Sequence, residues 1–290
     1  MNAQEGRKMD YKSIMTVWYG GDSGRPAFDL AARFAEAGEG HLNVLCLGID
    51  RIQPGLYYAG ASPAILADGI QAAQQAARTA EEEARNMLEG ADFNWSLQTM
   101  VVQISGIAFS VGTAARYNDL VILPRPYGTG LGEEAGLVLE AALFDGRAPV
   151  LVCPPEYEVK PADLPGHRIL IAWNQSTEAL AAIRGALPLI RNSEAVEIAI
   201  IDPPEHEGDR ADPGVELSRM LARHGANVTV NLVPRTVTRT AEQIQIRARD
   251  FGADLIVMGA YGHSRFRESI LGGATRDMLE DVEIPVLMGH

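Results

Sequence analysis

An internal repeat constrains the fold of this chain more than any other feature of its sequence. The string SIMTVWYGG near the start matches RILIAWNQS in the second half, and Trp18 and Trp173 occupy the same place in the two strings. Further along, NDLVILPRPYG matches ADLIVMGAYG, and APVLVCP matches IPVLMG. Both halves begin with the same strand and end with the same pair of strands, so the chain is predicted to hold two copies of one domain.

Between these strings, short apolar runs alternate with amphipathic stretches, the pattern of parallel strands joined by right-handed helical crossovers. In the first half, strands are expected at residues 13–18, 41–47, 94–102, 120–123 and 150–153. In the second half, they are expected at residues 168–173, 196–201, 227–233, 255–258 and 285–288. The longest helix is expected at residues 63–88. We predict an α/β fold with two repeated doubly wound domains, each a five-stranded parallel sheet flanked by helices.

The repeat also sets the expected domain boundaries. Residues 1–12 form an N-terminal tail, residues 13–153 the first domain and residues 167–290 the second. Between them, residues 154–166 read PPEYEVKPADLPG, and this mixture of proline and charge is typical of an interdomain linker. With 290 residues, 47% of them hydrophobic and 22% charged, the chain is long enough for two globular domains.

The charge of the chain argues against one class of partner. Its formal net charge is -13, whereas binding to a nucleic-acid backbone depends on clustered Lys and Arg. No nucleic-acid partner is therefore expected. A polyanionic ligand must be attracted locally, by helix amides, by nearby arginines or by a bridging divalent cation.

Hydropathy and cysteine use suggest a cytoplasmic protein with no membrane partner. No apolar run approaches the roughly 18 residues of a membrane span, and residues 1–12 lack the apolar core of a signal peptide. Cys46 and Cys153 each lie in an apolar, strand-like run and in no metal-ligand spacing. Both are expected to be reduced, buried thiols.

The closing segment carries the clearest functional signal. The apolar run from Leu255 to Met258 is typical of a buried parallel strand. Four glycines follow it: Gly259, Gly262, Gly272 and Gly273. Each could simply permit a turn, but together they let backbone amides approach a ligand closely. The spacing of these glycines closely resembles that of the nucleotide-binding universal stress proteins: two residues separate Gly259 from Gly262, and nine separate Gly262 from Gly272. The preceding strand and the closing Ile-Pro-Val strand resemble that family as well.

The resemblance implies an adenine nucleotide alpha hydrolase-like fold and a site for ATP or a related adenine nucleotide. Mg²⁺ is the divalent cation that could accompany the phosphates. In that family the glycine loop and the start of the next helix hold the phosphates, and unpaired amides at a helix start attract anions. Here the helix is expected to start near residues 272–275, where Thr275 offers a hydroxyl. Arg265, Arg267 and Arg276 could add positive charge.

In an open doubly wound sheet, a ligand lies beyond the carboxyl ends of the strands where the strand order reverses. The loop that faces the glycines follows the strand ending at Trp173. The family usually has an aspartate where Asn174 stands; Asn174 can still bond an adenine edge or a ribose hydroxyl, without charge. The nucleotide-binding residues implied by the resemblance are Trp173, Asn174, Ser176, Ile201, Gly259, Gly262, His263, Arg265, Gly272, Gly273, Ala274 and Thr275.

Three of these residues carry a second interpretation. Ser176 can be the N-cap of a helix over residues 177–190, with or without a ligand role. His263 could contact phosphate or act as an acid, but no paired carboxylate or nucleophile is visible nearby, so no catalytic residue and no metal site are predicted. Gly273 replaces the usual Ser or Thr; the lost phosphate contact is worth about 1 to 2 kcal/mol, or about tenfold in affinity, unless Thr275 or water replaces it.

The first half lacks this loop. Pro124 and Pro126 remove amides and fix the backbone where the second half has GAYG. Tyr19 stands where the second half has Asn174, and Leu137 follows the one matching glycine. No nucleotide is expected in the first half.

A second motif suggests a different class of protein. Residues 19–24, YGGDSG, are similar to the SGGxDS loop of ATP pyrophosphatases, which would make the chain an adenylating enzyme. The spacing is one residue short and the leading Ser is absent. Gly20 and Gly21 fit better as the turn before a helix capped by Ser23 or Asp22.

Three functions stay open. The first is a tandem universal stress protein that binds ATP in its second domain as a stress-response regulatory or sensing module, with slow hydrolysis at most. The second is a member that binds no nucleotide and acts through protein contacts. The third is an adenylating enzyme that works from the first-half loop.

The last strand of each domain, residues 150–153 and 285–288, is apolar and would lie at a sheet edge, where an unpaired strand invites pairing. Single-domain universal stress proteins often dimerise through this strand. The resemblance therefore implies an intramolecular pseudo-dimer that covers both edges. A homodimer of the whole chain stays open.

Overall fold

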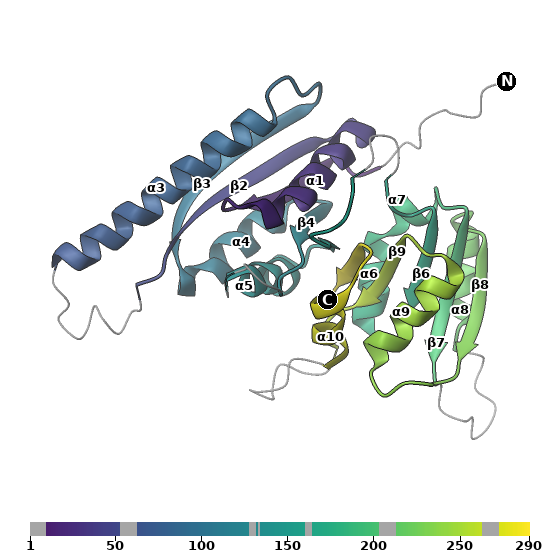
Figure 1. Cartoon of the computed structure of the whole chain (residues 1–290). Helices are drawn as coiled ribbons and strands as arrows, with labels where there is room; N and C mark the ends of the chain where they lie inside the picture. Colours follow the sequence, from purple (N-terminus) through teal and green to yellow (C-terminus); the bar gives the residue numbers. More distant parts are fainter. Residues whose placement is uncertain are drawn as a thin grey trace.

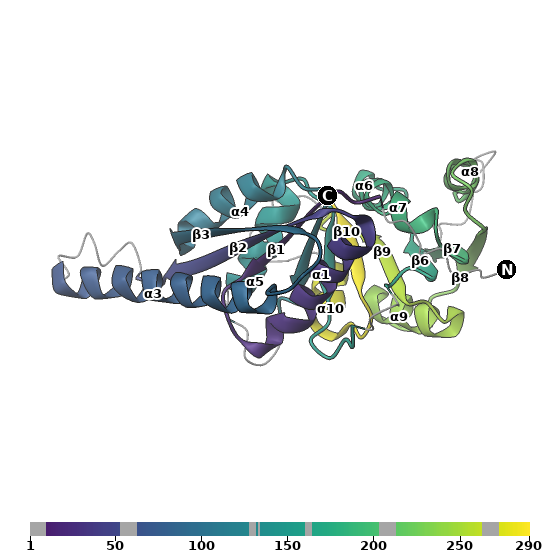
Figure 2. The same ribbon diagram turned by 90° about the horizontal axis from the view of Figure 1, so that it is seen from above.

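One continuous sheet forms the centre of the molecule. The computed structural model describes residues 10–52, 63–127, 132, 134–159, 164–202, 213–262 and 273–290 (Figure 1). Its ten strands lie in the order β3-β2-β1-β4-β5-β10-β9-β6-β7-β8, and helices cover both faces (Figure 2). The predicted α/β fold, with a mainly parallel sheet flanked by helices, is confirmed.

The elements fall close to the positions expected from the apolar runs. The first-half strands are β1 (Ser13–Trp18), β2 (His41–Asp50), β3 (Asn94–Gln103), β4 (Leu120–Pro124) and β5 (Val150–Cys153). The second-half strands are β6 (Arg168–Ala172), β7 (Ala195–Ile201), β8 (Val228–Val233), β9 (Leu255–Gly259) and β10 (Val286–Gly289). The helices are α1 (Arg25–Gly38), α3 (Pro63–Met87), α4 (Ile107–Ala115), α5 (Glu134–Glu140), α6 (Thr177–Gly185), α7 (Leu187–Ile190), α8 (Val215–Arg223), α9 (Thr240–Phe251) and α10 (Gly273–Asp281).

The repeat seen in the sequence is a repeat of topology. Within each half all strands are parallel, and the first strand lies between the second and the fourth. The halves meet where β5 and β10 pair antiparallel, with Val152 opposite Val286 and Val150 opposite Met288. The internal pairing of the two last strands, expected from their apolar edges, is therefore present.

Alternate residues of the strands supply two cores, one on each face of the sheet. Ile14 and Ile122 face the layer of α1, α3, α6, α7 and α8, whereas Met15 and Val121 face the layer of α4, α5, α9 and α10. Burial on both faces explains why these strands are continuous apolar runs and not alternating ones. Because β5 and β10 pair antiparallel, the strands of the two halves run in opposite directions, and their carboxyl ends lie at opposite edges of the common sheet.

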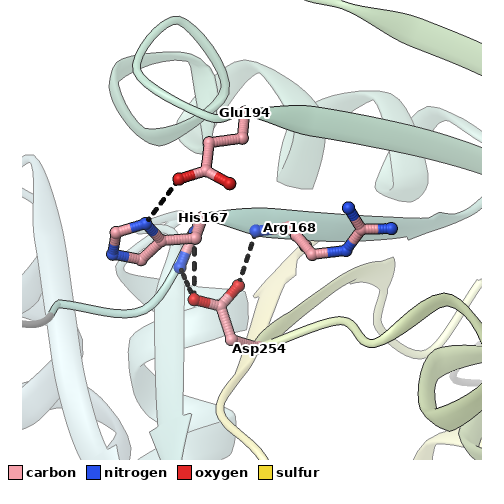
Figure 3. Close-up of polar contacts among 5 residues, drawn as sticks. His167, Arg168, Glu194 and Asp254 are labelled. Carbon is pink, nitrogen blue, oxygen red and sulfur yellow. Dashed lines mark hydrogen bonds and ion pairs between the residues drawn. The ribbon is translucent and has the colours of Figure 1, made fainter.

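An aspartate holds the start of β6 in place (Figure 3). The carboxylate of Asp254, which directly precedes β9, accepts hydrogen bonds from the backbone amides of Gly166 (3.1 Å), His167 (2.9 Å) and Arg168 (2.8 Å). The side chain of His167 reaches toward Glu194, with 3.4 Å between Nδ1 and Oε1. Asp254 therefore fixes the start of β6 against the start of β9.

The first half extends into an arm made of β2, β3 and α3, which reaches away from the rest of the sheet in Figures 1 and 2. Helix α3 is 25 residues long, and its buried stripe is alanine at 73, 77, 80 and 84. Gly48 of β2 makes room for the helix, since a Cβ there would lie 1.9 Å from the carbonyl oxygen of Ala73. Small residues on both sides thus hold helix and strand in close contact along the arm.

Two local predictions are corrected. The single helix expected at residues 177–190 is divided into α6 and α7 at Ala186, because Pro188 has no amide to bond the carbonyl of Arg184. Gly20 and Gly21 do form a turn, with φ of 89° and 92°. The expected cap by Ser23 or Asp22 is wrong, however, since Gly24 is the N-cap of α1 and no side chain caps it.

Two further findings concern the expectations from composition. Both cysteines are buried and unpaired, as predicted. Within the described part of the chain, no helix combines the length and the apolar character needed to cross a membrane.

Candidate functional site

A cavity of about 400 Å³ opens at the carboxyl ends of β6 and β9. These are the first and fourth strands of the second half, and they lie side by side where the strand order reverses. Such a switch point is where open α/β sheets bind ligands. The walls come from Ala172, Trp173, Asn174, Gln175, Ala199, Ile200, Ile201, Asp202, Arg235, Thr240, Ile244, Met258, Gly259, Tyr261, Gly262, Gly273, Ala274 and Thr275.

The loop after β6 presents Trp173 and Asn174 to this cavity. The backbone amide of Trp173 continues the ladder to Ala199, and its indole Nε1 donates to the carbonyl of Pro213 at 2.8 Å. The side-chain oxygen of Asn174 accepts from the amide of Ser176 at 3.1 Å. Asn174 therefore stabilises its own turn, while its exposed amide nitrogen can face a ligand.

Ser176 caps helix α6. Its Oγ accepts from the backbone amide of Ala179 at 3.1 Å, which confirms the capping interpretation. Ser176 is not among the residues that line the cavity. Its hydroxyl is engaged at the helix start, so a direct ligand contact through Ser176 has no support from this geometry.

Two of the loop glycines have different local environments. At Gly259 a Cβ would lie 2.5 Å from the amide nitrogen of Ala179, so this glycine allows the start of α6 to pack against β9. At Gly262, among the described residues, a Cβ would lie 3.3 Å from the end of the Glu178 side chain and 4.0 Å from the Cβ of Ser176. Gly259 thus has a packing role in addition to its place on the wall, and Gly262 is the better probe of ligand contact.

A hydrogen bond joins the loop to α10. Tyr261 has a left-handed backbone conformation with φ of 58°, and its amide donates to Oγ1 of the buried Thr275 at 3.2 Å. The Thr275 hydroxyl was predicted to contact phosphate, and its oxygen accepts this hydrogen bond from the loop. Gly273 is the first residue of α10 and Ala274 follows it, both at the cavity wall.

The structure brings nine of the twelve sequence-predicted residues to one edge of the sheet. Eight line the cavity, namely Trp173, Asn174, Ile201, Gly259, Gly262, Gly273, Ala274 and Thr275, and Ser176 lies beside them. His263, Arg265 and Gly272 lie outside the described residues, as does Arg267. Arg276 is described and forms an ion pair with Glu280 at 2.9 Å.

Sequence reasoning did not identify the charged pair at the mouth of the cavity. Asp202 directly follows β7 and Arg235 follows β8, with 3.6 Å between the arginine Nε and a carboxylate oxygen. Both side chains are exposed, at 64% and 42%. Their positions at strand ends were the signal that could have found them, because neighbouring parallel strands end at one edge.

Comparison with known proteins identifies the second half. Residues 166–290 match the model described as "Universal stress protein family". These residues form a universal stress protein domain. A 69-residue stretch is 36% identical to Universal stress protein Slr1230 of Synechocystis, covering 24% of this chain and 23% of that relative. The match thus spans less than a quarter of the relative's own length.

Solved structures resemble the whole chain in fold. A universal stress protein from Archaeoglobus fulgidus aligns over 95% of both chains with a TM-score of 0.66 and 16% identity. A functionally unknown protein from Pseudomonas aeruginosa aligns over 97% of this chain and 92% of its own with a TM-score of 0.59 and 16% identity. The arrangement of both halves therefore occurs in other proteins, one of them a universal stress protein.

Tyr261 connects the universal stress protein domain to the first half. Its ring packs against that of Phe144, with centroids 5.0 Å apart, and Phe144 meets His290 edge-on at 4.6 Å. Burial, followed by the nearby Tyr127, raises the pKa of the Tyr261 hydroxyl. The same residue thus donates its amide to Thr275 of α10 and packs its ring at the junction between the halves.

In the first half, a tyrosine ring, helix α3 and a paired carboxylate lie at the positions that correspond to the cavity of the universal stress protein domain. Tyr19, at the place of Asn174, packs against the core, and burial together with Glu134 raises its pKa to about 12. Gly48, which matches Asp202 in the repeat, lies under Ala73 of α3. The buried carboxylate of Glu134 is paired with Arg51.

Proposed function

We propose that the chain is a tandem universal stress protein whose second domain binds ATP or a related adenine nucleotide, acting as a stress-response regulatory or sensing module. The observation that carries this proposal is the cavity of about 400 Å³ between β6 and β9, bounded by a glycine loop and by the start of α10. This volume lies within the roughly 300 to 1,000 Å³ range of small-ligand sites.

The chemistry of the walls suits a nucleotide. Ala172, Ala199 and Met258 supply apolar surface for a flat base, while the side chain of Asn174 offers an amide to a base or a ribose. The amides of Gly273 and Ala274 lie in the first turn of α10, where helix amides have no intrahelical partner and attract anions. An overall charge of -13 makes this local attraction necessary, and Mg²⁺ on the phosphates would strengthen it.

The proposal confines the nucleotide to the second domain. The corresponding ground in the first half holds the Tyr19 ring, helix α3 packed on Gly48, and the Glu134 carboxylate. The Tyr19 ring and helix α3 take up space at these positions, which opposes a ligand there, and the Glu134 carboxylate is already paired with Arg51. The first half is therefore assigned a structural role beside the binding domain.

The first experiment is to denature the purified protein and to search for released adenine nucleotide by chromatography, followed by titration of the emptied protein with ATP and Mg²⁺. Gly262→Val should abolish binding, because the added side chain would occupy space at the cavity wall. Among the described residues, the nearest atom to a Cβ there is the end of the flexible Glu178 side chain, at 3.3 Å, so the variant should still fold. Asp22→Ala in the first-half loop is the matched control and should bind normally.

Tryptophan fluorescence gives an independent readout. Trp173 lines the cavity and Trp18 is its counterpart in the repeat. A nucleotide-dependent change in emission should persist in Trp18→Phe and disappear in Trp173→Phe. If no nucleotide is released, and ATP changes neither the fluorescence nor the melting temperature, the second domain binds no nucleotide. The chain would then act through protein contacts. Loss of binding only in Asp22→Ala would instead indicate an adenylating enzyme.

A further inference from the structure

The outer edge of the sheet in the first half is strand β3. We infer that β3 pairs antiparallel with β3 of a second copy of this chain, which joins two ten-stranded sheets across a twofold axis. Among the described residues β3 pairs in the sheet with β2 alone, so the other edge of residues 94–102 is open to a further strand.

The composition of β3 leaves this edge unprotected. Its sequence, NWSLQTMVVQ, contains no charged residue, no proline and no glycine over 10 residues. Soluble proteins usually block a free edge with lysine, proline, a bulge or a short strand. None of these devices is present within Asn94–Gln103, and its residues favour the extended conformation.

Exposed apolar side chains gather around this strand. Val101 of β3 and Ile104 just after it are each 41% exposed, Ile70 of α3 is 40% exposed and Phe109 of α4 is 78% exposed. Gly48 pairs with Val101 across the sheet and touches Ala73, so α3 places Ile70, one turn earlier, near the same end of the strand. In the described part of the second half, Leu232 is the comparable exposed side chain.

The arm presents the edge rigidly. β2 and β3 pair along all ten residues, from His41 opposite Asn94 to Asp50 opposite Gln103. The other outer strand, β8, has 6 residues, whereas β3 has 10. A ten-residue strand is about 34 Å long. A contact that extends along this length and about 24 Å across the sheet and its helix layers would bury the roughly 800 Å² per partner of a standard interface.

A second copy is the occupant that this surface fits. Twofold antiparallel pairing sets identical strands against each other, and β3 itself carries no charge. The Glu81 carboxylate of α3, which accepts from Thr99 of β3 at 2.7 Å, is paired with Arg85. Residues on the α3 side of one strand, such as Leu97 and Val101, would face the same residues of the other across the axis. The chain already joins its own two halves by this kind of pairing at β5 and β10.

Sedimentation of the full chain at increasing concentration tests the inference. The wild-type protein should reach a dimer. Val101→Lys, at an exposed position, should raise the dimer dissociation constant roughly 100-fold, because two apolar contacts are lost and two like charges are added. Leu232→Lys on β8, also exposed, is the matched control and should leave the constant unchanged. Circular dichroism checks that both variants are folded.

Hydrogen exchange provides a second measurement that does not rely on substitution. The β3 amides that point away from β2 should exchange more slowly as the dimer fills. A chain that stays monomeric at about 100 µM, well above ordinary dimer constants, overturns the inference. It is also overturned by a dimer that tolerates Val101→Lys, by one that Leu232→Lys weakens equally, or by β3 amides whose exchange is independent of concentration.

Discussion

Asp119 and Asp254 hold the same place in the two halves and perform the same task. Each directly precedes the fourth strand of its half and accepts hydrogen bonds from backbone amides where the first strand begins. Asp119 bonds the amides of Lys12 and Ser13 at 2.8 and 2.9 Å, and Asp254 bonds three amides, including that of Arg168. The repeat thus conserves this polar clamp at the amino ends of the first and fourth strands of each half, whereas the carboxyl ends differ: Asn174 lines the cavity in the second half and Tyr19 packs against the core in the first.

The clamp predicts the cost of removing it. Asp254→Ala should lower the free energy of unfolding by about 3 kcal/mol, because three amides lose their acceptor in a partly buried site. Urea denaturation measures this change. Glu194→Ala is the control, because Glu194 is 67% exposed and contacts the neighbouring His167 at 3.4 Å; it should cost less than about 1 kcal/mol. Equal effects of the two substitutions would contradict the assigned role.

Gly259 and Gly273 should respond differently to the same substitution. In Gly259→Ala the new methyl group meets backbone of α6 at 2.5 Å, so the protein should lose about 2 to 3 kcal/mol of stability. In Gly273→Ala no atom of the described residues lies within 4 Å of the new methyl group, and alanine favours the helix by up to about 1 kcal/mol. Thermal and urea melts of the two variants provide the comparison. A stable Gly259→Ala protein would show that α6 can move away from β9.

The bond between Tyr261 and Thr275 should matter for the nucleotide. Thr275→Val keeps the shape of the side chain but removes the oxygen that accepts the Tyr261 amide. The left-handed turn then loses its support, and affinity for ATP should fall about tenfold, with about 1 kcal/mol lost in stability. Calorimetric titration measures the affinity. Thr229→Val on the exposed face of β8 is the control and should bind as the wild type does.

A buried thiol and a buried phenol should make the folded protein less stable at alkaline pH. Burial, with a smaller contribution from Glu81, raises the pKa of the Cys46 thiol from 9.0 to about 12. Burial and Glu134 raise the pKa of Tyr19 from 10.0 to about 12. The unfolded chain therefore loses these protons first. The stability that they contribute is complete below pH 9.0 and is lost as pH rises toward 12.

Melting temperatures at about pH 8 and about pH 10.5 measure this effect, which reaches at most about 1.4 kcal/mol per pH unit for each group. Cys46→Ala removes one of the groups, so its melting temperature should fall less steeply over the same interval. A wild-type melting temperature that stays constant across this interval would mean that these groups titrate alike in the folded and unfolded chains.

Apolar patterning was sufficient to predict the sheet, because strands buried on both faces are continuous apolar runs. β1 and β5 begin and end where the sequence predicted them. Helix ends depended on local chemistry that patterning does not weigh. Pro188 divides the helix predicted at residues 177–190. Gly24 is the N-cap of α1, where a polar side chain was expected.

The candidate site was predictable only where a motif marks it. The glycine loop and Asn174 lie on the cavity wall as expected from the resemblance. Asp202 and Arg235 belong to no motif, and they meet because the register of β7 with β8 places Ile201 opposite Val233. The partner of the Thr275 hydroxyl was equally hidden, since it depends on the backbone conformation of Tyr261.

The pairing of β5 with β10 has a consequence for biosynthesis. β5 is made early, but the strand that completes its hydrogen bonding follows only after residues 154–285. At ~5 to 20 residues per second, the apolar edge of β5 waits on the order of ten seconds on the ribosome. A chain that stops before Val286 would never close that edge. Nascent and truncated forms should therefore be the ones that chaperones bind and that aggregate.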